Sequence, residues 1–99
     1  MDKKPSLYGS AADGCWLCES TRQVEVHHIY PSSRRPISDR EGCTIPLCHY
    51  HHQGLGGVHN DKEFDAWLRK DCQRRWEERE GLNEPDHETF RSIFYESFL

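Results

Sequence analysis

Two pairs of potential metal ligands constrain the fold of this chain more than any other feature. Cys15 and Cys18 are separated by two residues, and Cys48 and His51 repeat that spacing further along the chain. Two intervening residues let a tight turn present both donors to one tetrahedral zinc ion. A single Cys-x-x-Cys also suits a redox dithiol, but the second pair favours a structural zinc site formed by Cys15, Cys18, Cys48 and His51.

Spacing alone leaves other interpretations of these residues open. Cys48 can be a buried thiol and His51 a surface imidazole, and His49 can replace His51, although one intervening residue is poor geometry for a chelating turn. A redox dithiol protein is disfavoured because the pattern has no βαβ context. Cys43 and Cys72 have no partner at a useful spacing, so we interpret both as small apolar residues.

The chain is small and polar, which makes a metal a natural source of stability. It has 99 residues, of which 34% are hydrophobic, and its mean hydropathy is −0.95. One domain of this size has a marginal core, and small domains of this kind often fold around zinc. Three Trp, four Tyr and four Phe argue against disorder, because each can bury a large area.

Cysteine use and hydropathy predict a protein of a reducing compartment. The five cysteines are an odd number, and no apolar run approaches the roughly 20 residues that span a membrane. The first ten residues, MDKKPSLYGS, lack the apolar segment of a signal peptide. Thiols free for metal therefore fit better than a disulfide framework, and no membrane partner is expected.

The net charge of −4 neither supports nor excludes nucleic acid as a partner. Residues 1–60 hold six basic and six acidic residues, whereas residues 61–99 hold seven basic and eleven acidic ones. The acidity therefore belongs to the C-terminal part of the chain. Two bound divalent ions would make the first part positive, so the charge is permissive for DNA binding.

The pattern along the chain predicts an α+β fold, in which a small zinc-stabilised core is followed by two C-terminal helices. Residues 1–13 are polar and are expected to be loosely ordered, and residues 14–99 are expected to form a single domain with its core at 14–80. Alternating β-branched residues predict a strand at 23–30, and a short apolar run predicts a second strand at 44–48.

The segments between and after the strands have different signatures. Pro, Ser and Gly predict a loop at 31–42, and the glycine-rich stretch at 53–58 is expected to be flexible. A helix is predicted from Asn60, an N-cap with Glu63 in a capping box, to about residue 80, and a last helix from about residue 84 to the end. The apolar residues expected to face inward are Phe64, Trp67, Leu68, Cys72, Trp76, Phe90, Ile93, Phe94 and Phe98.

Four histidines near the predicted strands remain once a zinc site is filled. His27 and His28 are neighbours in the first strand, where adjacent side chains point to opposite faces, and His52 and His59 follow the second ligand pair. His87 is isolated. A His-His pair in a strand is by itself more often structural than functional. Its position between two ligand pairs makes a second site the better interpretation.

The combination of these residues resembles the HNH (ββα-metal) endonuclease family, and within it the small phage and prophage branch that carries a zinc knuckle. The resemblance lies in VEVHHIYP, then GCTIPLCHYHHQGLGGVHN, with Cys15-x-x-Cys18 upstream, and it covers residues 15 to about 80. The matching residues are His27, His28, Ile29, Tyr30, Arg35, Ser38, Gly42, Leu47, Cys48, His51, His52, Gly57, Val58 and His59.

This resemblance implies a role for each of the four histidines. His28 corresponds to the general base that activates water. His27, His52 and His59 correspond to the ligands of a catalytic Mg²⁺ or Mn²⁺ ion. The residue types suit the chemistry, because a histidine can accept a proton near neutral pH and a divalent ion can neutralise phosphate and stabilise the leaving 3′ oxygen.

Three further features bear on the predicted DNA site. Arg34 or Arg35 can clamp a phosphate through two parallel hydrogen bonds, and a solvated loop is an equally good interpretation of both arginines. The position of the family's asparagine holds Cys43 in this chain. The six residues before His59 must form a loop that returns this histidine to the site.

These observations predict a metal-dependent DNA endonuclease or nickase that hydrolyses phosphodiester bonds. The resemblance implies 5′-phosphate and 3′-hydroxyl products, the cytoplasm of a bacterial or phage-infected cell, and DNA with a recombination or packaging protein as partners. The alternative is a non-catalytic, zinc-stabilised module that binds DNA or protein through its C-terminal helices. Packing against the core is nevertheless the favoured role of their aromatic residues, which are Trp67, Trp76, Phe90, Phe94 and Tyr95.

Overall fold

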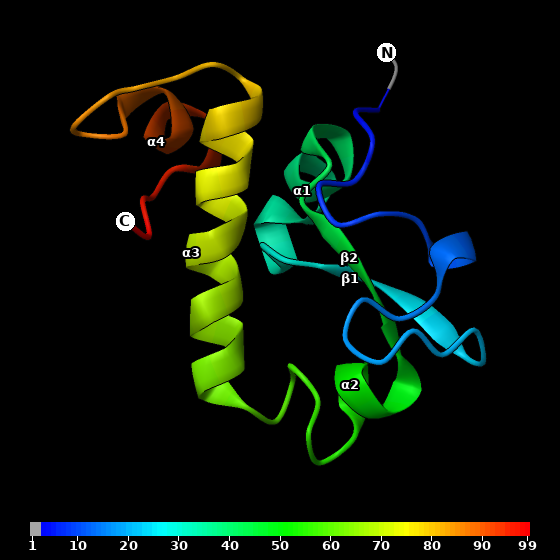
Figure 1. The fold of residues 1–99 in the computed structure, drawn as a ribbon. Helices are drawn as coiled ribbons and strands as arrows, with labels where there is room; N and C mark the ends of the chain where they lie inside the picture. The colour runs from blue at the N-terminus through cyan, green and yellow to red at the C-terminus, as the bar shows by residue number, and fades with distance from the viewer. Residues whose placement is uncertain (1–2) are drawn as a thin grey trace.

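A computed structural model describes residues 3–99 and confirms the α+β class, with a two-stranded antiparallel sheet and four α-helices in that range. In Figure 1, α3 stands beside the sheet, while α1 and α2 lie at opposite ends of the strands. No helix in the described part of the chain is long and apolar enough to cross a membrane. The elements are η1 (Ala11–Asp13), β1 (Val24–His28), η2 (Ser32–Arg34), α1 (Arg35–Glu41), β2 (Thr44–Cys48), α2 (His49–Gln53), α3 (Lys62–Arg79) and α4 (Glu88–Phe94).

The two predicted strands are confirmed, and they carry the histidine pair into the fold. They pair antiparallel, with His27 opposite Ile45 and His28 opposite Thr44. His27 lies on the buried face of β1 and is only 5% exposed, whereas its neighbour Val26 is 49% exposed. Burying an imidazole in place of an apolar side chain is costly unless a partner satisfies its nitrogens. The buried imidazole of His27 therefore needs a partner.

The segment predicted as a loop at 31–42 is helical instead, since η2 is followed directly by α1. Pro36 lies in the first turn of α1, where its missing N–H is tolerated, and Gly42 ends the helix in the left-handed region with φ of 78°. Ser38 is buried; its hydroxyl accepts from the Tyr30 N–H at 3.1 Å and donates to the Tyr30 carbonyl at 2.8 Å. In this segment, Pro36 and Gly42 therefore mark the two ends of a helix, and Ser38 is part of its buried side.

The start of α3 is set by Asp61 and not by Asn60, which corrects the predicted N-cap. Asp61 Oδ1 accepts from the N–H groups of Glu63 and Phe64 at 3.1 and 3.0 Å. Asn60 Nδ2 instead donates to two carbonyl oxygens at the C-terminal end of α2, at 2.9 and 2.8 Å. It therefore caps the short helix α2, which the sequence did not predict.

Aromatic side chains from α3 and α4 fill the core, and α4 is shorter than the predicted last helix. Phe90 and Phe94 stack with ring centroids 4.3 Å apart, and Trp76 meets Phe90 edge-on at 5.4 Å. These three side chains are buried, as expected. Trp67 and Tyr95 are exposed, so the inward placement of Trp67 was wrong. Most of the C-terminal aromatic surface is therefore used for packing.

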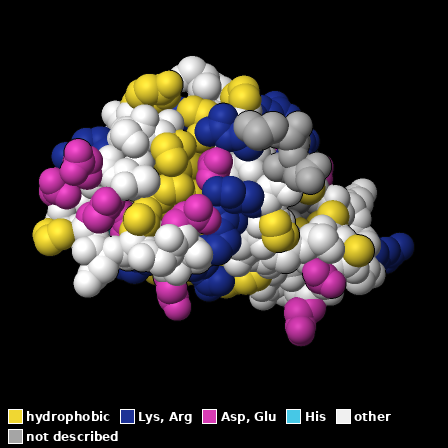
Figure 2. All heavy atoms as spheres, turned by 90° about the horizontal axis from the view of Figure 1, so that it is seen from above, with side chains coloured by type: hydrophobic (Ala, Val, Ile, Leu, Met, Phe, Trp, Pro, Cys, Tyr) yellow, Lys and Arg dark blue, Asp and Glu magenta, His cyan; other side chains and the backbone are white. Residues whose placement is uncertain are grey.

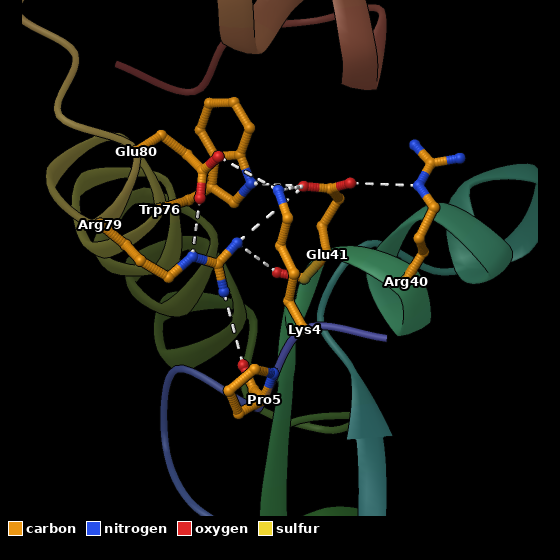
Figure 3. A network of polar contacts seen from close by, with 7 residues as sticks. All are labelled: Lys4, Pro5, Arg40, Glu41, Trp76, Arg79 and Glu80. Carbon is orange, nitrogen blue, oxygen red and sulfur yellow. Dashed lines mark hydrogen bonds and ion pairs between the residues drawn. The ribbon is translucent and has the colours of Figure 1, made fainter. Parts of the chain in front are cut away.

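A buried carboxylate joins the N-terminal segment to α1 and α3 (Figure 3). Glu41 accepts hydrogen bonds from Lys4 Nζ at 2.8 Å and from Trp76 Nε1 at 3.1 Å. Arg40 Nε also donates to this carboxylate, at 3.1 Å, and Arg79 Nη2 donates to the Glu41 backbone carbonyl at 2.6 Å. In Figure 2, which views the molecule from above, acidic and basic side chains adjoin one another across this end.

Residues 3–13 of the segment predicted to be loosely ordered make contacts with the rest of the domain, and residues 1–2 of that segment lie outside the described residues. The N–H groups of Lys4 and Leu7 donate to the carbonyls of Arg40 and Gly42, both at 2.9 Å. Tyr8 is buried, and its hydroxyl donates to Asp71 Oδ2 on α3 at 2.7 Å. Backbone pairing and one buried tyrosine therefore fix a segment that has little apolar surface.

Glu41→Gln is expected to make stability less dependent on pH in the acid range. Burial opposes ionisation, but hydrogen bonds from Lys4 and Trp76 outweigh it and hold the pKa of Glu41 below its ordinary value. Such a carboxylate stabilises the fold above its unfolded pKa of about 4.3, and the contribution is lost as pH falls through the folded pKa. At pH 7 the variant should lose about 1–3 kcal/mol of unfolding free energy.

The measurement is urea unfolding of both proteins from pH 7 down to about pH 2, a range that extends below the unfolded pKa of the carboxylate. Glu80→Gln is the control, because Glu80 also pairs with Lys4 but is more exposed than Glu41. Lys4 and Arg79 also hold the pKa of Glu80 below its ordinary value, but solvent screens this more exposed carboxylate, so Glu80→Gln should lose less of the wild-type pH dependence than Glu41→Gln. Equal pH slopes for wild type and Glu41→Gln would contradict the assignment of this stabilisation to Glu41.

Candidate metal centres

The four residues predicted to hold a structural zinc ion lie together, with one donor atom from each within 4.8 Å of all the others. They are Cys15, Cys18, Cys48 and His51, and we call this grouping the zinc knuckle. Cys18 Sγ is 3.8 Å from Cys48 Sγ, and His51 Nδ1 is 3.2 Å from Cys48 Sγ and 3.7 Å from Cys15 Sγ. A tetrahedral zinc ion with bonds of about 2.3 Å to sulfur and about 2.0 Å to nitrogen keeps its donors about 3.5–3.8 Å apart. This grouping can therefore bind a metal such as zinc.

Backbone contacts form the knuckle turn that presents Cys15 and Cys18. The Trp16 N–H donates to the Pro46 carbonyl of β2 at 2.8 Å, which attaches the turn to the strand that ends at Cys48. Gly14 has φ of 90°, and a side chain there would come within 2.8 Å of a backbone oxygen. Glycine is therefore required at the entry to the turn.

The same backbone also prepares the Cys15 thiol for a metal. Burial alone would raise its pKa, but hydrogen bonds from the backbone N–H groups of Cys48 and of the knuckle turn outweigh this and lower the pKa to about 6. A metal binds the thiolate form of cysteine. His49, the alternative fourth ligand, is exposed and lies outside the grouping, so His51 is the residue that joins the three cysteines.

The second grouping contains His27, His52 and His59, again with donor atoms within 4.8 Å of one another. His52 Nε2 and His59 Nε2 are 3.0 Å apart, and the ring of His27 lies 5.1 Å from each of the other two rings. The three donors come from β1, from α2 and from the loop after α2. Residues separated by more than thirty positions thus converge on one point.

His27 carries the clearest sign that this grouping suits a metal. Among the described residues, its Nε2 is the one buried side-chain nitrogen or oxygen without a hydrogen-bond partner. Burial, followed by the neighbouring His52 and His59, lowers the pKa of His27 to about 3, so its imidazole stays neutral with a free lone pair. A buried unpaired nitrogen is destabilising. A metal ion bound by the three histidines would satisfy it.

The glycine-rich loop returns His59 to the site, as its predicted role requires. The N–H groups of Val58 and His59 donate to the carbonyls of His51 and His52, at 2.9 and 3.2 Å. A side chain at Gly57 would approach the backbone of His52 to 2.7 Å. The loop can therefore pack directly on α2 only because glycine is small.

His28 and Arg35 border the three-histidine grouping. A hollow of about 210 Å³ opens beside it, and the hollow is lined by Val26, His27, His28, Pro31, Ser32, Arg35, His52 and His59. His28 Nε2 faces Asp39 Oδ1 at 3.5 Å. Although adjacent strand residues point to opposite faces, both His27 and His28 line this hollow.

The two arginines proposed as phosphate ligands are placed differently. Arg35 lines the hollow and a second one next to it. Arg34 Nη1 instead pairs with Glu96 Oε1 of the C-terminal segment at 2.8 Å. The structure therefore brings only Arg35 of the two to the histidines. Elsewhere, His87 Nδ1 forms a hydrogen bond with Glu77 Oε2 at 2.8 Å, and His87 belongs to neither grouping.

Two carboxylates near the histidines were not identified from the sequence. Glu25 Oε1 lies 2.7 Å from His52 Nδ1, and Asp39 faces His28. Lys3, and then His28, hold the pKa of Asp39 below its ordinary value. Period-two alternation in β1 could have revealed Glu25, since it shares a face with His27. Asp39 was hidden because its helix was taken for a loop.

Cys43, at the position of the family's asparagine, lies outside both groupings. It is buried, as is Cys72, and both are free thiols. A hydrogen bond with Cys72, together with burial, raises the pKa of Cys43 well above its ordinary value. Cys43 therefore remains an uncharged thiol, which agrees with its interpretation as a small apolar residue.

Comparisons with family models, with curated proteins and with solved structures give no match to this chain. Its function is therefore inferred from the geometry of its own residues. Two groupings of donors lie beside the two-stranded sheet, and a histidine and an arginine border the second grouping.

Proposed function

We propose that this chain is a metal-dependent DNA endonuclease or nickase of the HNH (ββα-metal) type. Cys15, Cys18, Cys48 and His51 hold a structural zinc ion. A second divalent ion is held by His27, His52 and His59. His28 activates the water that attacks a phosphodiester bond, which leaves 5′-phosphate and 3′-hydroxyl ends.

One observation carries the proposal: the three-histidine grouping is separate from the zinc knuckle and opens into a hollow. A metal needed only for folding is already provided for by the knuckle. The second grouping includes a buried imidazole nitrogen without a partner, and it is flanked by His28 and Arg35. Such an arrangement is expected of a catalytic site and has no purpose in a simple zinc-stabilised module.

The donor set also bears on the choice of ion. Imidazole nitrogens suit transition metals, whereas Mg²⁺ prefers oxygen ligands and retains several waters. Of the two ions predicted from the sequence, Mn²⁺ is therefore the better match to three histidines. When bound, such an ion would neutralise the phosphate and stabilise the leaving 3′ oxygen.

His28 and Arg35 supply the chemistry of the protein itself. Asp39 Oδ1 faces Nε2 of His28 at 3.5 Å, and a proton held on Nε2 toward this carboxylate would leave the Nδ1 lone pair to take a proton from water. Arg35 reaches the hollow and has no acidic partner among the ion pairs of the described residues, so its guanidinium can bind a phosphate oxygen. Arg34 is engaged by Glu96 and is assigned no role in binding.

The test is nicking of supercoiled DNA by zinc-loaded protein in a panel of Mn²⁺, Mg²⁺, Co²⁺, Ni²⁺ and Zn²⁺. Wild type is expected to convert the plasmid to the open-circular form, with Mn²⁺ more effective than Mg²⁺. Arg35→Ala should lower the rate about 10- to 100-fold, the equivalent of one or two charge-assisted hydrogen bonds. Arg34→Ala, the matched control, should lower it less than about threefold.

A protein that binds the second ion but cuts no DNA with any metal would refute the proposal. It would leave the metal-stabilised binding module as the remaining interpretation. Equal losses in the two arginine variants would contradict the assignment of phosphate binding to Arg35 alone. End-labelling of the nicked product tests the polarity, since a 5′-phosphate should block phosphorylation until a phosphatase removes it.

A further inference from the structure

We propose that Glu25 positions His52 for metal binding, and thereby sets the affinity of the three-histidine site. This inference rests on the second metal site of the proposed function. Glu25 touches neither the expected position of the ion nor the hollow. It acts through the imidazole of His52, which makes it a positioning residue.

The contact between the two side chains is short and well directed. Glu25 Oε1 lies 2.7 Å from His52 Nδ1, on the side of the ring away from His59. The opposite nitrogen, His52 Nε2, lies 3.0 Å from His59 Nε2, inside the grouping. The side chain of His52 is 12% exposed, so water has little access to compete for its Nδ1.

This geometry decides which nitrogen of His52 carries the proton. A neutral imidazole has one N–H donor and one lone pair, and the two nitrogens exchange these roles between tautomers. A carboxylate can only accept, so Glu25 requires the proton on Nδ1 and leaves the lone pair on Nε2, which faces the grouping. A carboxylate behind a ligating histidine also raises the basicity of the ligand and fixes the ring.

The position of Glu25 follows from the strand. It precedes His27 by two residues in β1, and residues at this spacing share one face of a strand. The face that provides one ligand therefore also provides the group that orients another. His49 contacts the second carboxylate oxygen, Oε2, through Nδ1 at 3.4 Å, and this longer, more exposed contact is secondary.

The experiment measures binding of Mn²⁺ to protein that already holds one zinc ion, by loss of the free-ion electron paramagnetic resonance signal. Glu25→Ala is expected to weaken Mn²⁺ binding about 10- to 100-fold. Glu25→Gln should recover part of this loss, because its amide oxygen can still accept from Nδ1–H. Glu78→Ala removes an exposed carboxylate of α3 and is the control, with affinity expected to stay within about twofold.

A second readout reports the tautomer directly and does not depend on metal affinity. Long-range ¹H–¹⁵N correlation spectra of zinc-loaded wild type should show His52 protonated at Nδ1. Glu25→Ala should shift it toward the Nε2–H form, with the zinc content and far-ultraviolet circular dichroism unchanged. If Glu25→Gln restores the Nδ1–H tautomer, the loss in Glu25→Ala is due to the missing hydrogen-bond acceptor and not to a change in the strand.

Wild-type Mn²⁺ affinity in Glu25→Ala, or a predominant Nε2–H tautomer in wild type, would overturn the role of Glu25. Neither readout requires DNA cleavage. A wild-type protein that binds Mn²⁺ in this site but fails to cut DNA would refute the proposed nuclease and leave the role of Glu25 standing. The two failures are therefore distinguishable.

Discussion

Replacing His28 by alanine is expected to lower metal-dependent nicking of supercoiled DNA by about 10²–10⁴-fold, the range typical for loss of a general base. The variant keeps all seven residues of the two groupings, so it should bind both ions as wild type does. Its melting temperature should change little, because His28 lies at the end of β1 and is not part of the aromatic core. The measurement is the initial rate of nicking with metal content determined on the same sample.

A suitable control is His87→Asn. His87 is the N-cap of α4 with φ of 55°, a conformation that asparagine tolerates, and its imidazole contacts Glu77 away from the site. This variant should cut DNA at the wild-type rate. Undiminished cleavage by His28→Ala would remove His28 from the mechanism, whatever the metal content.

Loss of the knuckle is expected to have the largest effect on folding. Cys48→Ser, or removal of zinc with a chelator, should leave the chain largely unfolded at 25 °C. Structural zinc contributes about 10–16 kcal/mol in zinc-finger peptides, whereas whole domains are stable by about 5–15 kcal/mol. The three segments joined at this point are the knuckle turn, the end of β2 and α2, and zinc is the group that would hold them together.

Circular dichroism and zinc analysis of the purified variants measure this effect. Cys43→Ala is the matched control, since Cys43 is a buried thiol outside the knuckle. It should retain one zinc ion per chain and a cooperative unfolding transition, although at a lower temperature. An unchanged melting temperature of wild type after complete removal of zinc would show that the knuckle has no structural role.

Ligand spacing predicted the grouping of Cys15, Cys18, Cys48 and His51, because spacing reports local geometry directly. When two residues separate two donors, a single turn brings the donors together, whatever the rest of the fold is. Cys15 with Cys18, and Cys48 with His51, could therefore be paired from the sequence. The strands were equally clear from their β-branched pattern. Assignment of His27, His52 and His59 to one site came from a family resemblance, and the geometry agrees with it.

The elements that were missed depend on contacts between distant parts of the chain. α2 has five residues, too few for a helical period, and it is held by the contacts of His51 and the cap from Asn60. α1 was obscured because Pro36 and Gly42 are typical of loops as well as of helix ends. Pairing of Arg34 with Glu96 likewise could not be inferred, since more than sixty residues separate them.

One turn of α2 carries a donor for each grouping, so ions bound in both groupings would affect one another. His51 faces the cysteines and His52, the next residue, faces His27 and His59. An ion held by His51 fixes the backbone of that turn, and so removes conformational entropy that the second ion would otherwise have to overcome. By linkage, the second ion must strengthen retention of the first to the same degree. With an ion in each grouping, the loss of one ion would therefore weaken retention of the other.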